Sequence, residues 1–486
     1  MHLCGLDDLG RMITDDAAMI TDWAAGRTSV EVEHELADAA HPAWSAMARI
    51  ADAADSDDEA VRGEGLGALF AGVVEPLNDG FSTAGRAVYA RLFAHAVWRV
   101  AAREARLAER LRAVGIGTEA ALHARYQTAR AGRQLAPEQA ERVVVLSRVT
   151  VGADVLLTSV VLQRLHQRYP AAELVVLGDA KLAGLLGGLP RVRVRSLSYA
   201  RRGPLRERLA SWLVLADAVA EESPDLVVAP DSRLDQLGIL PVCVPERYLL
   251  WENIRADGAE PCSLADQLDG WLAVRLGLSA QPVMTPKVAL DAPTAAAAAV
   301  MHAAFGARPL AAVKLDHGGN PAKSLPRAAE IALLADLRAK GWRVLLDRGF
   351  GPDELANSDA LCAAAGLVPT DIDDSGKGLG LAVAGLASGS LAEVQVIRFH
   401  GSIGGWAAAL SACGLAISYD SVGHHLAAAL GIPLVTAFTG HADPAFAVAW
   451  QPRGPAAVAV VEIPTAEKSD PVQWARVTAQ IPQANV

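Results

Sequence analysis

The chain has 486 residues, of which 52% are hydrophobic and 20% charged, a balance that predicts two or three packed domains and excludes a disordered chain. The five cysteines form no CxxC pair, which is typical of reduced thiols and not of a disulfide framework or a zinc knuckle. The net charge is -11, and the first 100 residues hold 17 acidic against 7 basic side chains. A nucleic-acid partner needs a basic stripe, so none is expected.

The sequence has no run of about 18 strongly apolar residues, so no membrane span is expected. The first ten residues carry aspartates where a secretory signal peptide would carry basic residues. Together with the reduced thiols, this pattern predicts a cytoplasmic protein.

Residues 1–140 are predicted to form an all-helical N-terminal domain, because no run of β-branched residues reaches strand length. The clearest helix is expected at residues 87–114, where apolar side chains recur every three or four positions before Gly115. Two interpretations stay open for this helix. It packs into a core, or it binds a protein partner or a second copy of the chain.

After Glu141 the pattern changes to short apolar runs that alternate with amphipathic stretches, which predicts buried parallel strands joined by helices. In residues 141–290 we expect strands at 143–146, 174–177, 192–194 and 226–229, with helices at 154–169 and 205–221. In residues 291–486 we expect strands at 310–314, 343–346, 394–397, 415–418, 434–437 and near 458, with helices at 327–340, 352–365, 406–413 and 425–430. The Pro- and Ala-rich residues 281–298 are expected to be a linker.

This order of elements predicts an α/β protein with two Rossmann-like domains after the helical one. In such domains ligands bind at the carboxyl ends of the strands, so a substrate can be held in a cleft between the two sheets. Three loops at predicted strand ends contain candidate functional residues.

The first loop, residues 147–154, contains Gly152 and ends at Asp154. A carboxylate at the start of a helix can act as a base, or it can cap the helix by accepting hydrogen bonds from first-turn N–H groups. Both interpretations stay open on the spacing alone.

The second loop, residues 315–324, combines Gly318 and Gly319 with Lys323, one of only 7 lysines in the chain. Such a loop can surround phosphates with its N–H groups while the ammonium neutralises charge. It lacks the GxxxxGK[ST] pattern of a Walker loop. A solvated surface lysine is the alternative.

The third loop, residues 417–426, contains Asp420, Ser421, Gly423, His424 and His425 before a predicted helix. Free N–H groups and the helix dipole favour an anionic ligand there. The alternative is that Asp420 or Ser421 only caps the helix and that the histidines lie on its surface. A metal site is not expected, because adjacent histidines at a helix start point apart and no further histidine or carboxylate cluster is expected to complete the site.

Residues 419–433 and 438–444 resemble the D[ST]GxxHLAAALGxP and F-G-x-T-D-P motifs of glycosyltransferase family 9, the heptosyltransferase family. Residues 152–170 and 323–326 resemble two further motifs of the family, so the resemblance covers about residues 141–486. It implies the GT-B fold, two Rossmann-like domains facing across a cleft, and transfer with inversion at the anomeric carbon without a metal.

The resemblance also implies roles for individual residues. Asp154 matches the base that takes the proton from the acceptor hydroxyl, Glu354 matches a ribose contact, and Gly401 matches a loop glycine. The positions expected near the donor diphosphate or in its turn are Lys323, Asp420, Ser421, Gly423 and His425. The chain departs from the family motifs at Ala153, Leu325 and Val422, which takes the place of the first turn glycine.

The expected function is therefore transfer of a sugar from a nucleotide sugar such as ADP-heptose to a hydroxyl of a glycan, a natural product or a protein. The nucleotide sugar is a co-substrate, and no other cofactor is expected. Two alternatives stay open, a nucleotide-sugar epimerase of GT-B architecture and a non-catalytic scaffold that binds nucleotide sugar.

Overall fold

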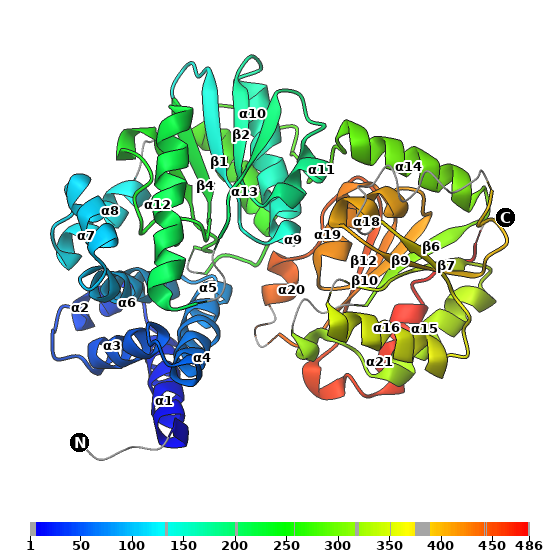
Figure 1. Cartoon of the computed structure of the whole chain (residues 1–486), viewed down its shortest axis with the longest axis horizontal. Coiled ribbons are helices and arrows are strands. Elements are labelled where there is room, and N and C mark those ends of the chain that lie inside the picture. Colours follow the sequence, from blue (N-terminus) through cyan, green and yellow to red (C-terminus); the bar gives the residue numbers. More distant parts are fainter. Residues whose placement is uncertain are drawn as a thin grey trace.

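The computed structural model describes residues 6–131, 135–199, 203–256, 258–315, 320–349, 351–374, 389–441, 443 and 445–484. A helical segment comes first and is followed by two parallel β-sheets with helices on their faces (Figure 1). The predicted α/β fold class with an all-helical N-terminal region is confirmed. The domain boundaries at residues 140 and 290 stay predictions.

The helical segment contains α1 (Leu6–Ala24), α2 (Ser29–Glu35), α3 (Pro42–Ala54), α4 (Glu59–Gly67), α5 (Glu75–Asp79), α6 (Thr83–Ala101), α7 (Ala105–Ala113) and α8 (Glu119–Ala131). A π-helical stretch at Ala68–Val74 joins α4 to α5 without a break. The prediction of one helix over residues 87–114 is wrong. The chain turns after α6, and Glu104 takes an extended conformation as the N-cap of α7.

The first sheet has the order β3-β2-β1-β4-β5, and all of its strands are parallel. Its strands are β1 (Arg142–Leu146), β2 (Glu173–Gly178), β3 (Val192–Ser196), β4 (Leu226–Pro230) and β5 (Tyr248–Trp251). The strand order reverses between β1 and β4. In open parallel sheets the ligand crevice lies at the carboxyl ends of the strands at such a reversal.

The second sheet has the order β12-β11-β10-β6-β7-β9-β8 and is also parallel. Its strands are β6 (Leu310–Lys314), β7 (Arg343–Asp347), β8 (Thr370–Asp373), β9 (Val396–His400), β10 (Leu415–Tyr419), β11 (Leu434–Phe438) and β12 (Val458–Glu462). Here the order reverses between β6 and β10. The loops that contain Lys323 and Asp420 follow these two strands.

The helices around the sheets are α9 (Val151–Ala153), α10 (Ser159–Arg168), α11 (Ala183–Leu186), α12 (Leu205–Glu222), α13 (Leu264–Arg275), α14 (Ala292–Phe305), α15 (Arg327–Ala339), α16 (Pro352–Ala364), α18 (Ile403–Leu410), α19 (Val422–Ala429), α20 (Ala445–Ala449) and α21 (Pro471–Thr478). A π-helical stretch at Asp154–Thr158 joins α9 to α10. The linker prediction is wrong for its last residues, because α14 begins at Ala292 with Asp291 as its N-cap.

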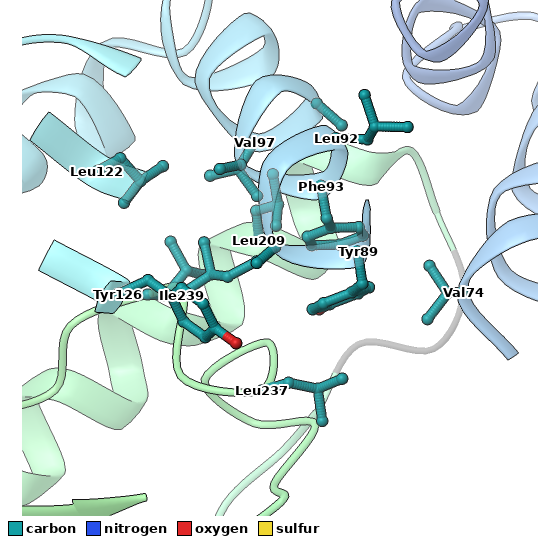
Figure 2. Close-up of a cluster of buried hydrophobic side chains, with 14 of the residues drawn as sticks. Val74, Tyr89, Leu92, Phe93, Val97, Leu122, Tyr126, Leu209, Leu237 and Ile239 are labelled. Atoms are coloured by element: carbon teal, nitrogen blue, oxygen red, sulfur yellow. The ribbon is translucent and has the colours of Figure 1, made fainter. Parts of the chain in front are cut away.

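The helical segment shares a hydrophobic core with one face of the first sheet. Alternate residues of β1 point to opposite faces, so Val144 belongs to this core while Val143 belongs to the core on the other face. Figure 2 shows Phe93 of α6 near Leu209 of α12, with Ile239 of the loop after β4 in the same cluster. The core-packing interpretation of α6 is therefore confirmed, and a protein partner for another face of the segment stays a prediction.

The core between the sheets contains side chains from β1 to β5 and from β6 to β11, so the two α/β halves are packed on each other. The other face of the second sheet has a core of its own with α15, α16 and α21. Within the described residues, no helix has both the length and the apolar character to span a membrane.

Candidate functional site

The loop after β1 meets the helix after β10, and this contact defines the junction of the two halves. A Cβ atom on Gly152 would lie 3.2 Å from Cδ2 of His425 and 3.2 Å from Cα of Val422. The guanidinium of Arg148 lies 5.7 Å from the ring centroid of Trp450, just after α20 in the second half. Gly152 therefore lets the loop after β1 pack closely against the start of α19 in the other half of the molecule.

Lys323 and Asp420 form an ion pair at the strand reversal of the second sheet. Nζ of Lys323 lies 2.5 Å from Oδ2 of Asp420, although 97 residues separate them in the chain. The lysine side chain is 23% exposed and its Nζ lies 5.6 Å from the ring centroid of Phe446, while Asp420 is buried. The ammonium is thus fixed from one side and accessible from the other, which suits neutralisation of an anionic ligand.

Ser421 is the N-cap of α19, and its Oγ accepts a hydrogen bond of 3.3 Å from the N–H of Gly423. The capping interpretation is confirmed for Ser421. A Cβ atom on Gly423 would lie 2.5 Å from Cδ of Lys314 and 2.9 Å from Oγ of Ser418. Gly423 therefore lets the start of α19 pack directly against β6.

His424 and His425 are buried, so the interpretation as helix-surface residues is wrong. Burial lowers the pKa of His424 to about 3, and burial together with His424 lowers the pKa of His425 well below its usual value. Both rings are neutral at pH 7. Nδ1 of His424 lies 3.2 Å from Oγ1 of Thr436, whereas Nδ1 of His425 has no hydrogen-bond partner among the described residues.

The expectation that no carboxylate joins the two histidines is also wrong. Ligand atoms of Asp420, His424 and His425 all lie within 4.8 Å of one another. However, the ammonium of Lys323 already forms an ion pair with Asp420 and would repel a metal cation. The cluster with Lys323 is therefore better suited to an anion than to a metal.

A cavity of about 360 Å³ opens at the carboxyl ends of β6 and β7, between α15 and α16. Pro321 and Ser324, on either side of Lys323, line it. Glu354 also lines it, and its Oε2 accepts a hydrogen bond of 3.2 Å from the N–H of Gly351. The volume of this cavity and its position beside Lys323 fit a nucleoside.

Gly401 follows β9 and does not line this cavity. A Cβ atom there would overlap the carboxylate of Asp374, which accepts hydrogen bonds of 2.6 Å from both the N–H and the Oγ of Ser402. Gly401 thus makes room for a carboxylate that holds the next turn. Gly318, Gly319, Ala442 and Pro444 of the predicted motifs lie outside the described residues.

Asp154 is 1% exposed and accepts three hydrogen bonds. The donors are Oγ of Ser147 at 2.7 Å, the N–H of Arg148 at 2.8 Å and Oγ1 of Thr158 at 2.7 Å. Burial raises the pKa of Asp154, and these hydrogen bonds oppose the rise. The helix N-cap is Thr150 and not Asp154, so the carboxylate instead ties the loop after β1 to the π-helical stretch that precedes α10.

A buried charge network that the sequence did not predict lies at the carboxyl ends of β4 and β5. Arg86 of α6 donates to Oδ1 of Asp231 at 2.5 Å and to Oδ1 of Asn253 at 2.6 Å. Arg148 pairs with the same aspartate. Burial alone would raise the pKa of Asp231, but Arg148 and Arg86 hold it below its usual value. No local pattern marks Arg86, which lies 145 residues from its partner.

Of the predicted site residues, the structure brings together Lys323, Asp420, Ser421, Gly423 and His425, and it places Glu354 in the adjacent cavity. Asp154 lies on the other side of the junction, and Gly401 lies beside Asp374. The ligand contacts expected for all of these residues stay predictions.

No protein-family model matches the sequence, and no curated protein sequence matches it. Solved structures similar to the chain include the Escherichia coli ADP-heptose LPS heptosyltransferase II, at 16% identity and a TM-score of 0.47 over 70% of this chain and 99% of that one. The E. coli heptosyltransferase WaaC with ADP is similar at 18% identity and a TM-score of 0.48, over 69% of this chain and 97% of that one. A glycosyltransferase family 9 protein of Veillonella parvula is similar at 16% identity and a TM-score of 0.47, over 66% and 87%.

Proposed function

We propose that the chain is an inverting glycosyltransferase that binds a nucleotide sugar in its second half and transfers the sugar to a hydroxyl group. The observation that carries this proposal is the Lys323–Asp420 pair beside the cavity at the strand reversal of the second sheet. This arrangement offers a cavity for the nucleoside and, next to it, a fixed ammonium for the diphosphate.

In this proposal the nucleoside lies in the cavity with its ribose near Glu354. The diphosphate lies against Lys323, with the N–H groups at the start of α19 and Nδ1 of His425 as further donors. The acceptor oxygen forms a bond to the anomeric carbon while the bond to the diphosphate breaks. Lys323 stabilises the charge that develops on the leaving group, the role for which other enzymes use a metal ion.

ADP-heptose is the donor that we propose first, because the motifs around Asp420 resemble those of the heptosyltransferase family. The acceptor would be a glycan, a natural product or a protein. It would approach from the first half of the molecule, where the loops after β1 and β4 lie at the junction.

A panel of nucleotide sugars and free nucleotides tests the proposal. We expect the melting temperature of the purified chain to rise with one nucleotide series, because a ligand that binds only the folded state stabilises it by mass action. The nucleotide sugar that stabilises the chain should then be turned over, with release of the nucleoside diphosphate. Absence of stabilisation by every member would contradict the proposal, and stabilisation without turnover would favour the scaffold alternative.

A further inference from the structure

The short helix after β11 presents two aromatic side chains at the junction of the halves. Phe446 of α20 and Trp450, which directly follows the helix, are partly exposed, whereas Ala445, Ala447 and Ala449 are buried. The two rings lie on one side of the helix, with 6.3 Å between their centroids. Figure 1 shows α20 on the side of the second half that faces the first half.

Each ring lies beside a cation, and the two cations come from different halves. Nζ of Lys323 lies 5.6 Å from the ring centroid of Phe446, and the guanidinium of Arg148 lies 5.7 Å from that of Trp450. Lys323 is proposed to hold the diphosphate, and Arg148 belongs to the half from which the acceptor is proposed to approach. Because the transferred sugar is bonded to the diphosphate and must reach the acceptor, it has to lie along these two rings.

Polar atoms at this surface lack partners. The ring of His441 stacks with Phe446, with 5.8 Å between the centroids and 20° between the planes. Nε2 of His441 lies 3.1 Å from Oε1 of Glu462, whereas its Nδ1 is buried and has no hydrogen-bond partner among the described residues. The same holds for Nε1 of Trp450. Most buried polar atoms in folded proteins have a partner, so a ligand with hydroxyl groups can complete both.

An aromatic surface with polar atoms at its margin suits a sugar. A sugar ring has C–H groups that pack on aromatic side chains, and its hydroxyl groups both donate and accept hydrogen bonds. The charge of Arg148, at the far end of the surface from Lys323, is balanced by Asp231. A neutral sugar therefore fits this surface better than a second phosphate.

We propose that His441, Phe446 and Trp450 form the binding surface for the transferred sugar. The ring of Phe446 packs against C–H groups of the sugar, and Nδ1 of His441 and Nε1 of Trp450 bond to its hydroxyls. This inference rests on the proposed function and adds the chemical class of the transferred group, a sugar in its closed ring form. Phe446 is a specificity-determining residue, because it favours a nucleotide that carries a sugar ring over the bare nucleotide.

The first test is calorimetric titration of Phe446→Leu with the nucleotide sugar that stabilises the chain in the panel, and separately with its nucleoside diphosphate. We expect the affinity for the nucleotide sugar to fall about 10-fold, because an aromatic contact is lost, while the affinity for the nucleoside diphosphate stays within about twofold of wild type. Equal losses for the two ligands would show that Phe446 only positions Lys323, and would overturn the inference while leaving the proposed function intact.

Two further variants serve as controls. Phe70→Leu replaces a partly exposed phenylalanine of the helical segment that also has a cation beside it, the guanidinium of Arg208 at 4.8 Å from the ring centroid. It should bind both ligands as wild type does. Phe446→Tyr keeps the ring and should keep the wild-type preference for the nucleotide sugar. The same loss of preference in Phe446→Tyr as in Phe446→Leu would count against a role for the ring.

A change in the ligand tests the same surface without a change in the protein. A nucleoside diphosphate linked to glycerol carries hydroxyl groups but no sugar ring. Wild type should bind the nucleotide sugar about 10-fold more tightly than this compound, whereas Phe446→Leu should bind the two with nearly equal affinity. Equal affinities in wild type would overturn the inference, whether or not the variant folds. No binding of any of these ligands to wild type would contradict the proposed function, and the inference with it.

Discussion

Two aspartates near the junction of the halves have opposite surroundings. Asp154 follows the loop after β1, where it accepts three hydrogen bonds and has almost no exposed surface. Asp79 lies at the end of a helix, is partly exposed, and interacts with three cations that come from both halves. The motif that resembles a known family selects Asp154, whose carboxylate is held by hydrogen bonds within the first half, whereas the charges that act on Asp79 come from all three parts of the molecule.

The difference teaches that a match to a motif does not by itself define the surroundings of a carboxylate. A carboxylate that satisfies several buried donors stabilises a loop, and removing it leaves those donors unpaired. Burial raises the pKa of both carboxylates, so a raised pKa alone does not identify a base.

The largest expected effect comes from the network that holds the helical segment on the first sheet. Arg86→Met should lower the free energy of unfolding by about 3–5 kcal/mol, because Asp231 would lose one of its two buried arginine partners. Urea denaturation measures this change. Arg99→Met, also on α6, removes the part-exposed ion pair with Asp52 and should cost about 1 kcal/mol or less. Equal losses in the two variants would show that the buried network does not fix the segment.

The second-largest expected effect is the loss of stability on removing the carboxylate of Asp154. Asp154→Ala should lower the free energy of unfolding by about 2–4 kcal/mol, since it leaves Ser147, Thr158 and the N–H of Arg148 without their acceptor. Thermal denaturation checks this at pH 7. A variant with the wild-type melting temperature and a strongly reduced rate would instead support Asp154 as the base.

Most of the sheet architecture could be predicted from the sequence, because buried parallel strands consist of short runs of apolar residues. β6 coincides with its predicted range, and β1 differs by one residue. Two strands were missed for physical reasons. β8 is a mostly exposed edge strand with the polar sequence Thr-Asp-Ile-Asp, and β5 is only four residues long and follows an irregular loop.

The candidate site could be predicted only in part. The loops with Lys323 and Asp420 stand out in the sequence, but the contact between them depends on the order of β6 and β10 in the sheet. Asp79 has no local signal, since it is one of many acidic residues in the first 100. Apart from Glu75, the charged groups that act on it come from segments more than 60 residues away, so only the folded chain brings them together.

The most direct test of the central claim is calorimetric titration of ADP, and separately of UDP, into the wild type and Lys323→Ala. Loss of one charge-assisted contact to phosphate costs roughly 1.5–3 kcal/mol, so we expect affinity for the preferred nucleotide to fall about 10- to 100-fold. Lys181→Ala, exposed in the first half, serves as the control and should bind as wild type does. A tenfold or larger loss confined to Lys323→Ala is the predicted result, and unchanged affinity for both nucleotides would contradict the account.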